Sequence, residues 1–214
     1  PRAGVNDVHK AVEAASQAFE SEAWHGLMAK ERGDLLFKLA DVFARNAERI
    51  ADIEVRDNGK LMSEMLGQMH YIPQWFKYYG GLADKVEGRV SCIDKPGMFH
   101  YITHEPVGVV ATITPWNSPM MLAIWKIAPA LAAGCTIVAK PSEFTSASML
   151  VFAELVEESG FPPGVFNVIT GYGHEVGESL VSHPKVDKIA FTGGEAGGRS
   201  VYQAAAASFK RVTL

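Results

Sequence analysis

Short apolar runs alternate with longer helical segments from residue 107 to the end of this 214-residue chain. The apolar runs predict strands over 107–114, 135–140, 165–170, 188–192 and 211–214. The segments between them predict helices over 119–133 and 145–158, a third ending at Val181 and a fourth ending near Ser208. Continuous apolar strands that alternate with helices are typical of a parallel sheet buried on both faces. We therefore expect an α/β fold with helices flanking a parallel sheet.

The first 85 residues predict helices alone. Apolar side chains recur at helical spacing over 7–20, 30–58 and 61–79. Asn58-Gly59 is a typical end for the second helix, and Pro73 is expected to bend the third. The N-terminal region is therefore expected to pack as helices beside the sheet.

Residues 86–105 predict a β-hairpin that protrudes from the body. Its strands are expected over 89–93 and 98–105, because Lys95-Pro96-Gly97 between them is typical of a turn. The polarity of the hairpin is mixed, which is typical of a segment that packs on another subunit. The chain thus divides into a helical part (1–85), a hairpin (86–105) and a sheet region (106–214).

The charge and composition exclude several classes of function. The formal net charge of −4 gives no electrostatic basis for binding nucleic acid or an anionic membrane. The longest apolar stretch, 120–139, contains Lys126, Pro129 and Gly134, which favours helix, turn and strand over a membrane span. Neither Cys92 nor Cys135 has the spacing of a disulfide framework or a metal site, so no metal is expected. With no visible signal peptide, a cytoplasmic location is expected.

Ligands of parallel α/β sheets bind outside the carboxyl ends of the strands, so the turn after each strand is informative. The first turn is Thr114-Pro115-Trp116-Asn117-Ser118, and it lacks the usual glycine-rich fingerprint. Asn117 offers a neutral amide donor suited to a developing oxyanion. The alternative is an ordinary Asn in a proline-fixed turn.

The second predicted strand ends in Lys140-Pro141-Ser142-Glu143. An acidic side chain at this place can accept hydrogen bonds from both hydroxyls of an adenosine ribose, and Lys140 could donate to the same ribose. A carboxylate there would repel a 2′-phosphate, which favours NAD over NADP. The alternative is a surface Lys–Glu pair beside the start of a helix.

The third and fourth predicted strands lead into glycine-rich turns. The turns run from Gly171 to Gly177 and from Phe191 to Gly198, and each precedes a helix. Glycines in this position let the backbone approach a phosphate closely. Either turn alone has an ordinary tight turn as its alternative, whereas two in one sheet favour a nucleotide site.

These motifs occur together in an order and spacing that resemble one family. They are Pro115-Trp116-Asn117, the stretch 125–131, Lys140-Pro141-Ser142-Glu143, 160–165 with Asn167, Phe191-Thr192-Gly193, and the flanking segments 57–60 and 104–108. Over nearly its whole length the chain resembles the cofactor-binding portion of the NAD(P)-dependent aldehyde dehydrogenase superfamily. The resemblance implies a Rossmann-like NAD-binding sheet over 106–214, with 1–85 as the helical part of the same domain. It also places 86–105 in a subunit-bridging sheet, so a homodimer or homotetramer is expected.

The resemblance implies a role for each residue at the carboxyl edge. Asn117 would hold the oxyanion of a cysteine thiohemiacetal. Lys140 and Glu143 would hold the adenosine ribose, and Gly173 and Val201 would line the adenine pocket. The full set implied for cofactor binding is Ile113, Thr114, Pro115, Trp116, Lys140, Ser142, Glu143, Gly173, Phe191, Thr192, Gly193, Gly194 and Val201. The aldehyde tunnel would include Ser118, Leu122 and Trp125.

Three residues depart from the family pattern. Gly194 replaces the usual serine, which removes one hydroxyl contact to the pyrophosphate. Glu195 places a carboxylate near the same turn, and this weakens cofactor binding unless the side chain points away. Ser118 replaces a common phenylalanine, so we expect a roomier tunnel wall.

The implied function is NAD(P)-dependent oxidation of a small aldehyde to a carboxylic acid, with NAD preferred. A cysteine thiolate attacks the carbonyl and a hydride passes to the nicotinamide. The cysteine and the catalytic glutamate would lie beyond Leu214, in a catalytic domain absent from this chain. These residues alone are expected to bind nucleotide weakly and to be inactive. The alternatives are a nucleotide-binding module without catalysis, or a relative that transfers the acyl group to coenzyme A.

Overall fold

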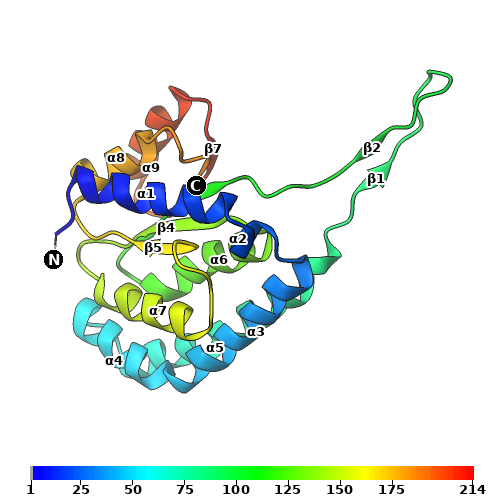
Figure 1. Cartoon of the computed structure of the whole chain (residues 1–214). Coiled ribbons are helices and arrows are strands. Elements are labelled where there is room, and N and C mark those ends of the chain that lie inside the picture. The colour runs from blue at the N-terminus through cyan, green and yellow to red at the C-terminus, as the bar shows by residue number, and fades with distance from the viewer. Residues whose placement is uncertain (1) are drawn as a thin grey trace.

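The computed structural model describes residues 2–214; residue 1, where the predicted helical part begins, lies outside the described residues. A five-stranded sheet with strand order β5-β4-β3-β6-β7 lies at its centre (Figure 1). The strands are β3 (Val109–Ile113), β4 (Thr136–Lys140), β5 (Phe166–Val168), β6 (Lys188–Phe191) and β7 (Arg211–Thr213). All neighbouring pairs in this sheet are parallel. The predicted α/β fold class is therefore confirmed.

The register of the sheet brings three strand ends level with one another. Ile113, the last residue of β3, pairs with Lys140 at the end of β4 and with Phe191 at the end of β6. The loops that follow these strands consequently start at one edge of the sheet. This is the edge at which ligands of parallel sheets bind.

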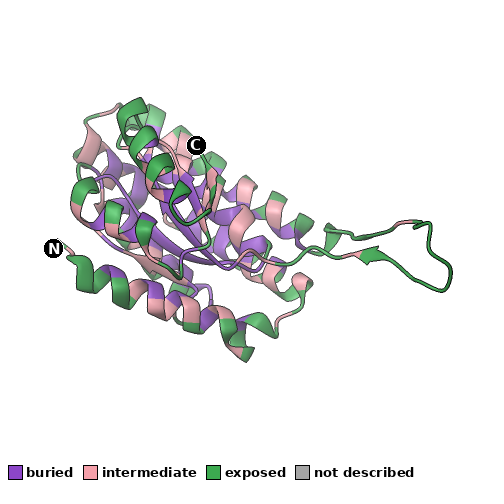
Figure 2. Cartoon of the chain, turned by 90° about the horizontal axis from the view of Figure 1, so that it is seen from above, coloured by how far each residue is buried: buried purple, intermediate pink, exposed green. Residues whose placement is uncertain are grey.

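Helices cover both faces of the sheet, and the core lies in two layers. On one face α1 (Val5–Glu20), α8 (Glu178–Ser182) and α9 (Glu195–Ala206) pack on β3, β4 and β6. On the other face lie α6 (Pro119–Ala132) and α7 (Ala147–Glu158). Because both sides are covered, every residue of β3 and β4 is buried (Figure 2).

A second helical layer packs outside α6 and α7. It contains α3 (Ala29–Arg45), α4 (Ala47–Asn58) and α5 (Met62–Leu82), with the short helix α2 (Glu22–His25) and the 3-10 turn η1 (Ala83–Lys85) at its ends. Its largest buried side chains, including Phe43 and Phe76, meet Phe152 of α7. The N-terminal helices therefore share one continuous core with the sheet region.

Two helix predictions are corrected by the structure. The helix predicted over 30–58 is interrupted at Asn46, whose side-chain amide donates to the Val42 carbonyl oxygen at 2.9 Å and competes with the helical backbone. Its predicted end is confirmed, because Gly59 caps α4 in the left-handed conformation at φ 72°. Thr145 does not cap α7, which starts two residues later after Ser146.

The segment after β5 forms a tighter structure than a simple turn. One turn of π-helix, η2 (Gly173–Gly177), runs directly into α8. A Cβ at Gly171 would lie 3.0 Å from a methyl group of Val176, and its φ of 152° disfavours any other residue. Glycine here lets the backbone fold back closely over the edge of the sheet.

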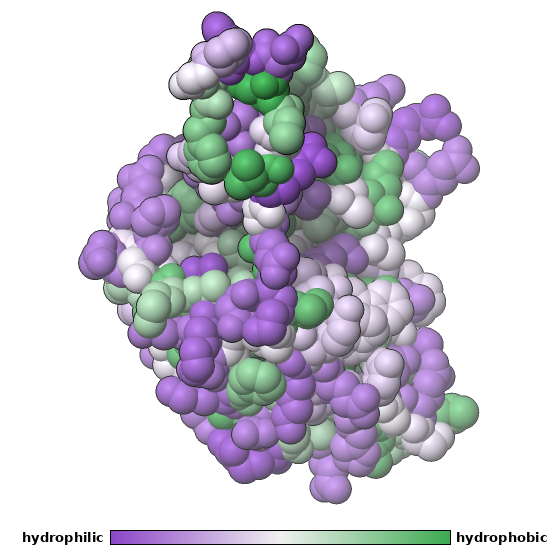
Figure 3. All heavy atoms as spheres, turned by 90° about the vertical axis from the view of Figure 1, so that its right-hand side faces the viewer, coloured by the Kyte–Doolittle hydropathy of each residue, from purple (hydrophilic) through white to green (hydrophobic). Residues whose placement is uncertain are grey.

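The hairpin projects far from the body as an antiparallel ribbon (Figures 1 and 2). Its paired strands, β1 (Arg89–Val90) and β2 (Tyr101–Ile102), are shorter than predicted, since nothing in residues 2–214 packs on the ribbon's outer part. Val90, Met98, Phe99 and Tyr101 are all exposed. Seen end-on in Figure 3, the ribbon mixes hydrophobic and hydrophilic residues.

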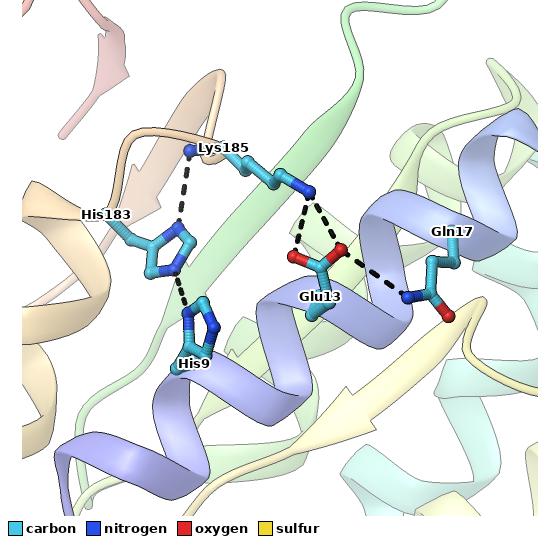
Figure 4. A network of polar contacts seen from close by, with 5 residues as sticks. All are labelled: His9, Glu13, Gln17, His183 and Lys185. Carbon is cyan, nitrogen blue, oxygen red and sulfur yellow. Dashed lines mark hydrogen bonds and ion pairs between the residues drawn. The ribbon is translucent and has the colours of Figure 1, made fainter.

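Helix α1 is tied to the segment between α8 and β6 by polar contacts (Figure 4). The ring nitrogens of His9 and His183 lie 3.1 Å apart, and the Lys185 ammonium donates to both carboxylate oxygens of Glu13 at 2.8 Å. Helix α1 is thereby joined to a segment more than 170 residues later in the sequence. Within residues 2–214, no helix has both the length and the apolar character needed to cross a membrane.

Candidate functional site

A cavity of about 740 Å³ opens at the carboxyl edge of the sheet, where the loops after β3, β4 and β6 meet. It collects almost all of the predicted cofactor residues. Its lining contains Ile113, Thr114, Pro115, Trp116, Lys140, Ser142, Glu143, Gly173, Phe191, Thr192, Gly193 and Gly194, together with Asn117 and Leu122. Residues that are up to 81 positions apart in the sequence thus face one space.

Val201 lies in an adjoining pocket of about 330 Å³. The two cavities share Ile113, Lys140, Gly173 and Phe191, so they form one connected groove along the sheet edge. The walls of the smaller pocket are mostly apolar and include Val181 and Ala204. Its mostly apolar lining suits an aromatic group.

Lys140 brings a charged amine into this buried setting. Its side chain runs past Gly177, whose hypothetical Cβ would lie 3.7 Å from Lys140 Cδ. The ammonium donates to the Pro141 carbonyl oxygen at 3.0 Å and lies 3.6 Å from a carboxylate oxygen of Glu143. Burial lowers the pKa of Lys140, and the charge of Glu143 partly opposes that effect. Lys140 is therefore buried at the cavity wall, whereas the side chain of Glu143 is 32% exposed.

The loop after β3 is anchored to its neighbours through the backbone. The Thr114 N–H donates to the Lys140 carbonyl oxygen at 3.2 Å, and the Thr192 N–H donates to the Ile113 carbonyl oxygen at 3.0 Å. The Thr114 hydroxyl oxygen is buried without a hydrogen-bond partner. Beyond these anchors Trp116 and Asn117 are exposed on the cavity. The amide of Asn117 is therefore available to a ligand, whereas the Thr114 hydroxyl is buried.

Phe191 explains part of the glycine-rich turn after β6. A Cβ at Gly193 would lie 2.5 Å from the Phe191 ring, and one at Gly197 would lie 3.0 Å from it. Gly194 has open space around it instead. The carboxylate of Glu195 accepts a hydrogen bond from Arg199 at 2.9 Å and is almost fully exposed.

Sequence reasoning missed Lys126, which supports the same turn from behind. Its ammonium donates to the Thr192 hydroxyl at 2.7 Å and to the Leu122 carbonyl oxygen at 3.1 Å. Burial lowers the pKa of this lysine. The available signal was that Lys126 is the single charged residue in the otherwise apolar α6.

The three predicted tunnel residues do not converge within residues 2–214. Leu122 lines the main cavity, whereas the Ser118 hydroxyl accepts a hydrogen bond from Gln68 at 3.2 Å. Trp125 packs edge-on against Trp75, with ring centroids 5.8 Å apart. It lies beside a different cavity, of about 390 Å³, that also contains Cys135.

Neither cysteine lies at the main cavity. Cys135 is buried next to Val107 and Gly108 before the start of β4, and burial raises the pKa of its thiol. Cys92 is exposed on the ribbon. Within residues 2–214, no group of three or more His, Cys, Asp or Glu side chains could hold a metal ion.

The comparisons with known proteins decide the family. The model of the aldehyde dehydrogenase family matches residues 1–214. The chain belongs to the aldehyde dehydrogenase family. It is 49% identical over 214 residues to a (Z)-2-((N-methylformamido)methylene)-5-hydroxybutyrolactone dehydrogenase of Acinetobacter baylyi, covering 100% of this chain and 44% of that relative. It is 46% identical over 211 residues to human aldehyde dehydrogenase 1A1, covering 97% and 42%.

Solved aldehyde dehydrogenase structures share the fold. A betaine aldehyde dehydrogenase from Staphylococcus aureus in complex with NAD+ is 41% identical, with a TM-score of 0.96 over 99% of this chain and 42% of that one. An NAD-dependent aldehyde dehydrogenase from Sinorhizobium meliloti is 40% identical, with the same TM-score and coverage. The chain spans less than half the length of the relatives it matches, and it corresponds to their N-terminal portion.

Proposed function

We propose that the protein containing this chain oxidises an aldehyde to a carboxylic acid with NAD, and that these residues form its cofactor site. The observation that carries the proposal is the single groove at the carboxyl edge of the sheet, into which the loops after β3, β4 and β6 all project. The solved relatives that bind NAD+ support it.

The groove fits NAD in three parts. We assign the adenine to the apolar pocket beside Val201 and the adenosine ribose to Lys140 and Glu143. We assign the pyrophosphate to the backbone at Gly193 and Gly194, which lies before the N-terminus of α9 and has open space at Gly194. The carboxylate of Glu143 accepts ribose hydroxyls and repels a 2′-phosphate, so NAD is preferred to NADP. When bound, the cofactor supplies the acceptor for the hydride.

Asn117 is the catalytic group that this chain contributes. Its amide is exposed on the groove and can donate a hydrogen bond to the carbonyl oxygen as negative charge develops there. Because neither Cys92 nor Cys135 lines the groove, we assign the thiolate that forms the thiohemiacetal to a residue outside these 214 residues. The same holds for the base that activates water.

We also propose that the ribbon over 86–105 joins subunits of a homo-oligomer. Its apolar side chains, including Val90 and Phe99, are exposed, and the ring of Phe99 lies against that of Tyr101 on the same ribbon. Contiguous exposed apolar residues on a projecting element are typical of a subunit contact.

The decisive experiment uses the full-length protein that carries these residues. NAD and NADP reduction are measured over a panel of aldehydes, with and without coenzyme A, and the products are identified. We expect a free carboxylic acid and a preference for NAD. A strong preference for NADP would contradict the role of Glu143, and an acyl-coenzyme A product would replace the proposed reaction by acyl transfer.

A further inference from the structure

Helix α4 presents two carboxylates to the helices that follow the cavity loops. Glu54 and Asp57 are three residues apart and therefore lie on one face of α4. Glu54 is fully buried within the second helical layer, and Asp57 is half-buried. Neither side chain touches the groove described above.

Glu54 binds the first turn of α6. Its Oε1 atom accepts a hydrogen bond from the Met120 N–H at 2.8 Å and a second from the Ser148 hydroxyl at 3.0 Å. Met120 is the second residue of α6, and Ser148 is the second residue of α7. One buried carboxyl group thus joins the starts of both helices.

Asp57 binds the start of α7. Its Oδ2 atom accepts a hydrogen bond from the N–H of Ala147, the first residue of that helix, at 3.1 Å. The first N–H groups of any helix have no partner inside it, and a negative side chain is favoured there. Asp57 is therefore placed as a cap from another part of the chain.

Neither α6 nor α7 caps itself. Ser118 and Ser146 stand at the N-cap positions, where a serine hydroxyl ordinarily accepts from the helix, and neither makes a side-chain cap hydrogen bond. The two local caps are replaced by two carboxylates of a helix more than 60 residues away. This arrangement ties the position of each helix start to α4.

Groove residues lie close in sequence to the starts of α6 and α7. Asn117 lies two positions before Pro119, the first residue of α6. The loop 140–143 reaches α7 through a short turn in which the Thr145 N–H donates to the Ser142 carbonyl oxygen at 3.2 Å. A shift of either helix start therefore moves a wall of the groove.

We propose that Glu54 and Asp57 are positioning residues that set the two polar walls of the groove from behind. Glu54 fixes the amide of Asn117 through α6, and Asp57 fixes Lys140 and Glu143 through α7. The inference rests on the proposed oxyanion role of Asn117 and on the proposed ribose contact of the 140–143 loop. Each carboxylate then has its own consequence. Glu54 affects the chemical step through Asn117, and Asp57 affects cofactor affinity through the 140–143 loop.

The test compares variants of the full-length protein in kcat, NAD affinity by calorimetry, and Tm. Glu54→Met removes the acceptor at similar volume and is expected to lower kcat about tenfold with little change in NAD affinity, because a displaced catalytic group costs rate. Glu54→Gln retains an oxygen acceptor and is expected to restore kcat to within about twofold of the parent.

Asp57→Ala is expected to weaken NAD binding about fivefold through loss of the cap, with kcat at saturating NAD unchanged. Asp57→Asn restores the affinity.

The matched control is Asp52→Asn on the same helix. Asp52 pairs with Arg56 at the surface, so its loss is expected to change neither kcat nor NAD affinity. A positioning role also requires that Glu54→Met add little once Asn117 is already Ala, because the two substitutions then remove the same contribution.

Three results would overturn the inference. Equal losses in kcat for Asp52→Asn and Glu54→Met would make the effect general to α4. Additive losses from Glu54→Met and Asn117→Ala would show that Glu54 does not act through Asn117. A lower Tm with unchanged kcat and NAD affinity would reduce both carboxylates to structural roles. If Asn117→Ala itself leaves kcat unchanged, the proposed oxyanion role fails together with the Glu54 assignment, and NAD affinity in the Asp57 variants still decides the other wall.

Discussion

The two sides of the groove are built in opposite ways. The loops after β3 and β4 contain Pro115, Pro141 and polar side chains, and the helices behind them are capped by carboxylates of α4. The loops after β5 and β6 offer glycine backbone, and at Gly173 and Gly194 a Cβ would meet nothing within 4 Å. One side holds functional groups at fixed positions, whereas the other leaves room for a ligand to approach the main chain. Within one site, different loops therefore hold the functional side chains in position and let a ligand approach the backbone closely.

Removing the amide of Asn117 should have the largest effect. Asn117→Ala is expected to lower kcat by about 10²- to 10³-fold, since one preorganised donor to an oxyanion is worth that much. Steady-state kinetics of the full-length protein measure it. Asn6→Ala, at an exposed position of α1, serves as the control and should be neutral. A loss confined to KM would contradict a role in the chemical step.

The pH dependence of the free energy of unfolding should report on the buried carboxyl group of Glu54. Burial raises the pKa of Glu54 from 4.5 to about 7, although the hydrogen bonds from Met120 and Ser148 act in the opposite direction. A raised folded pKa means that the folded state binds the proton more tightly. The contribution of Glu54 to stability is therefore full below about pH 4.5 and is lost as the pH rises to about 7, by roughly 3 kcal/mol.

Chemical denaturation at pH 5 and at pH 8 measures this loss, and Glu54→Gln should remove the part that belongs to Glu54. Asp52→Asn is the control on the same helix, and it should leave the pH dependence unchanged. An identical pH dependence in the parent and in Glu54→Gln would contradict the assignment.

In the glycine-rich loop after β6, a methyl group added at one position should disrupt the packing, and one added at the next position should not. Gly193→Ala brings a Cβ to 2.5 Å from the Phe191 ring, so we expect a destabilisation of about 1–3 kcal/mol by overpacking and weaker NAD binding. Gly194→Ala, one position along in open space, is the matched control for packing, and we expect little change in stability there. Thermal melts and calorimetry distinguish the two. Equal effects at both positions would show that the contrast in packing does not matter.

Removing the negative charge of Glu143 should alter the preference between NAD and NADP. Glu143→Gln is expected to weaken NAD binding by about fivefold and to narrow the preference for NAD over NADP, because the amide no longer repels a 2′-phosphate. The ratio of kcat/KM for the two cofactors measures this. Glu154→Gln, an exposed residue of α7 paired with Arg49, should leave the ratio unchanged.

Sequence patterns predicted the strands of the sheet better than the details of the helices and turns around it. The strands of the sheet were predictable because burial on both faces leaves continuous apolar runs, and the turns after them follow from the rule for parallel sheets. The break at Asn46 depends on one side chain that competes with the helical backbone, and the helical period continues through it. The π-turn at Gly173 depends on packing against the rest of the chain.

Contacts between distant helices account for what was missed. Lys126 and Glu54 each interrupt an apolar stripe, and a charge in a stripe does not reveal its partner. Those partners, Thr192 and Met120, lie 66 residues away in both cases. Trp125 and Ser118 were grouped with Leu122 by the family pattern, whereas their own contacts are with Trp75 and Gln68.

The long span between Glu54 and Met120 has a consequence for the order of assembly. Helices α3 to α5 leave the ribosome before the strands do, and local helical contacts form faster than contacts across a long loop. The carboxylates of α4 are then in place before α6 and α7 exist. Closing the intervening loop carries an entropic cost that grows slowly with its length, and the contacts of the α6 and α7 helix starts with α4 offset that cost. The groove is therefore among the last parts of these residues to acquire its shape, and slow steps in folding should appear first as lost cofactor binding.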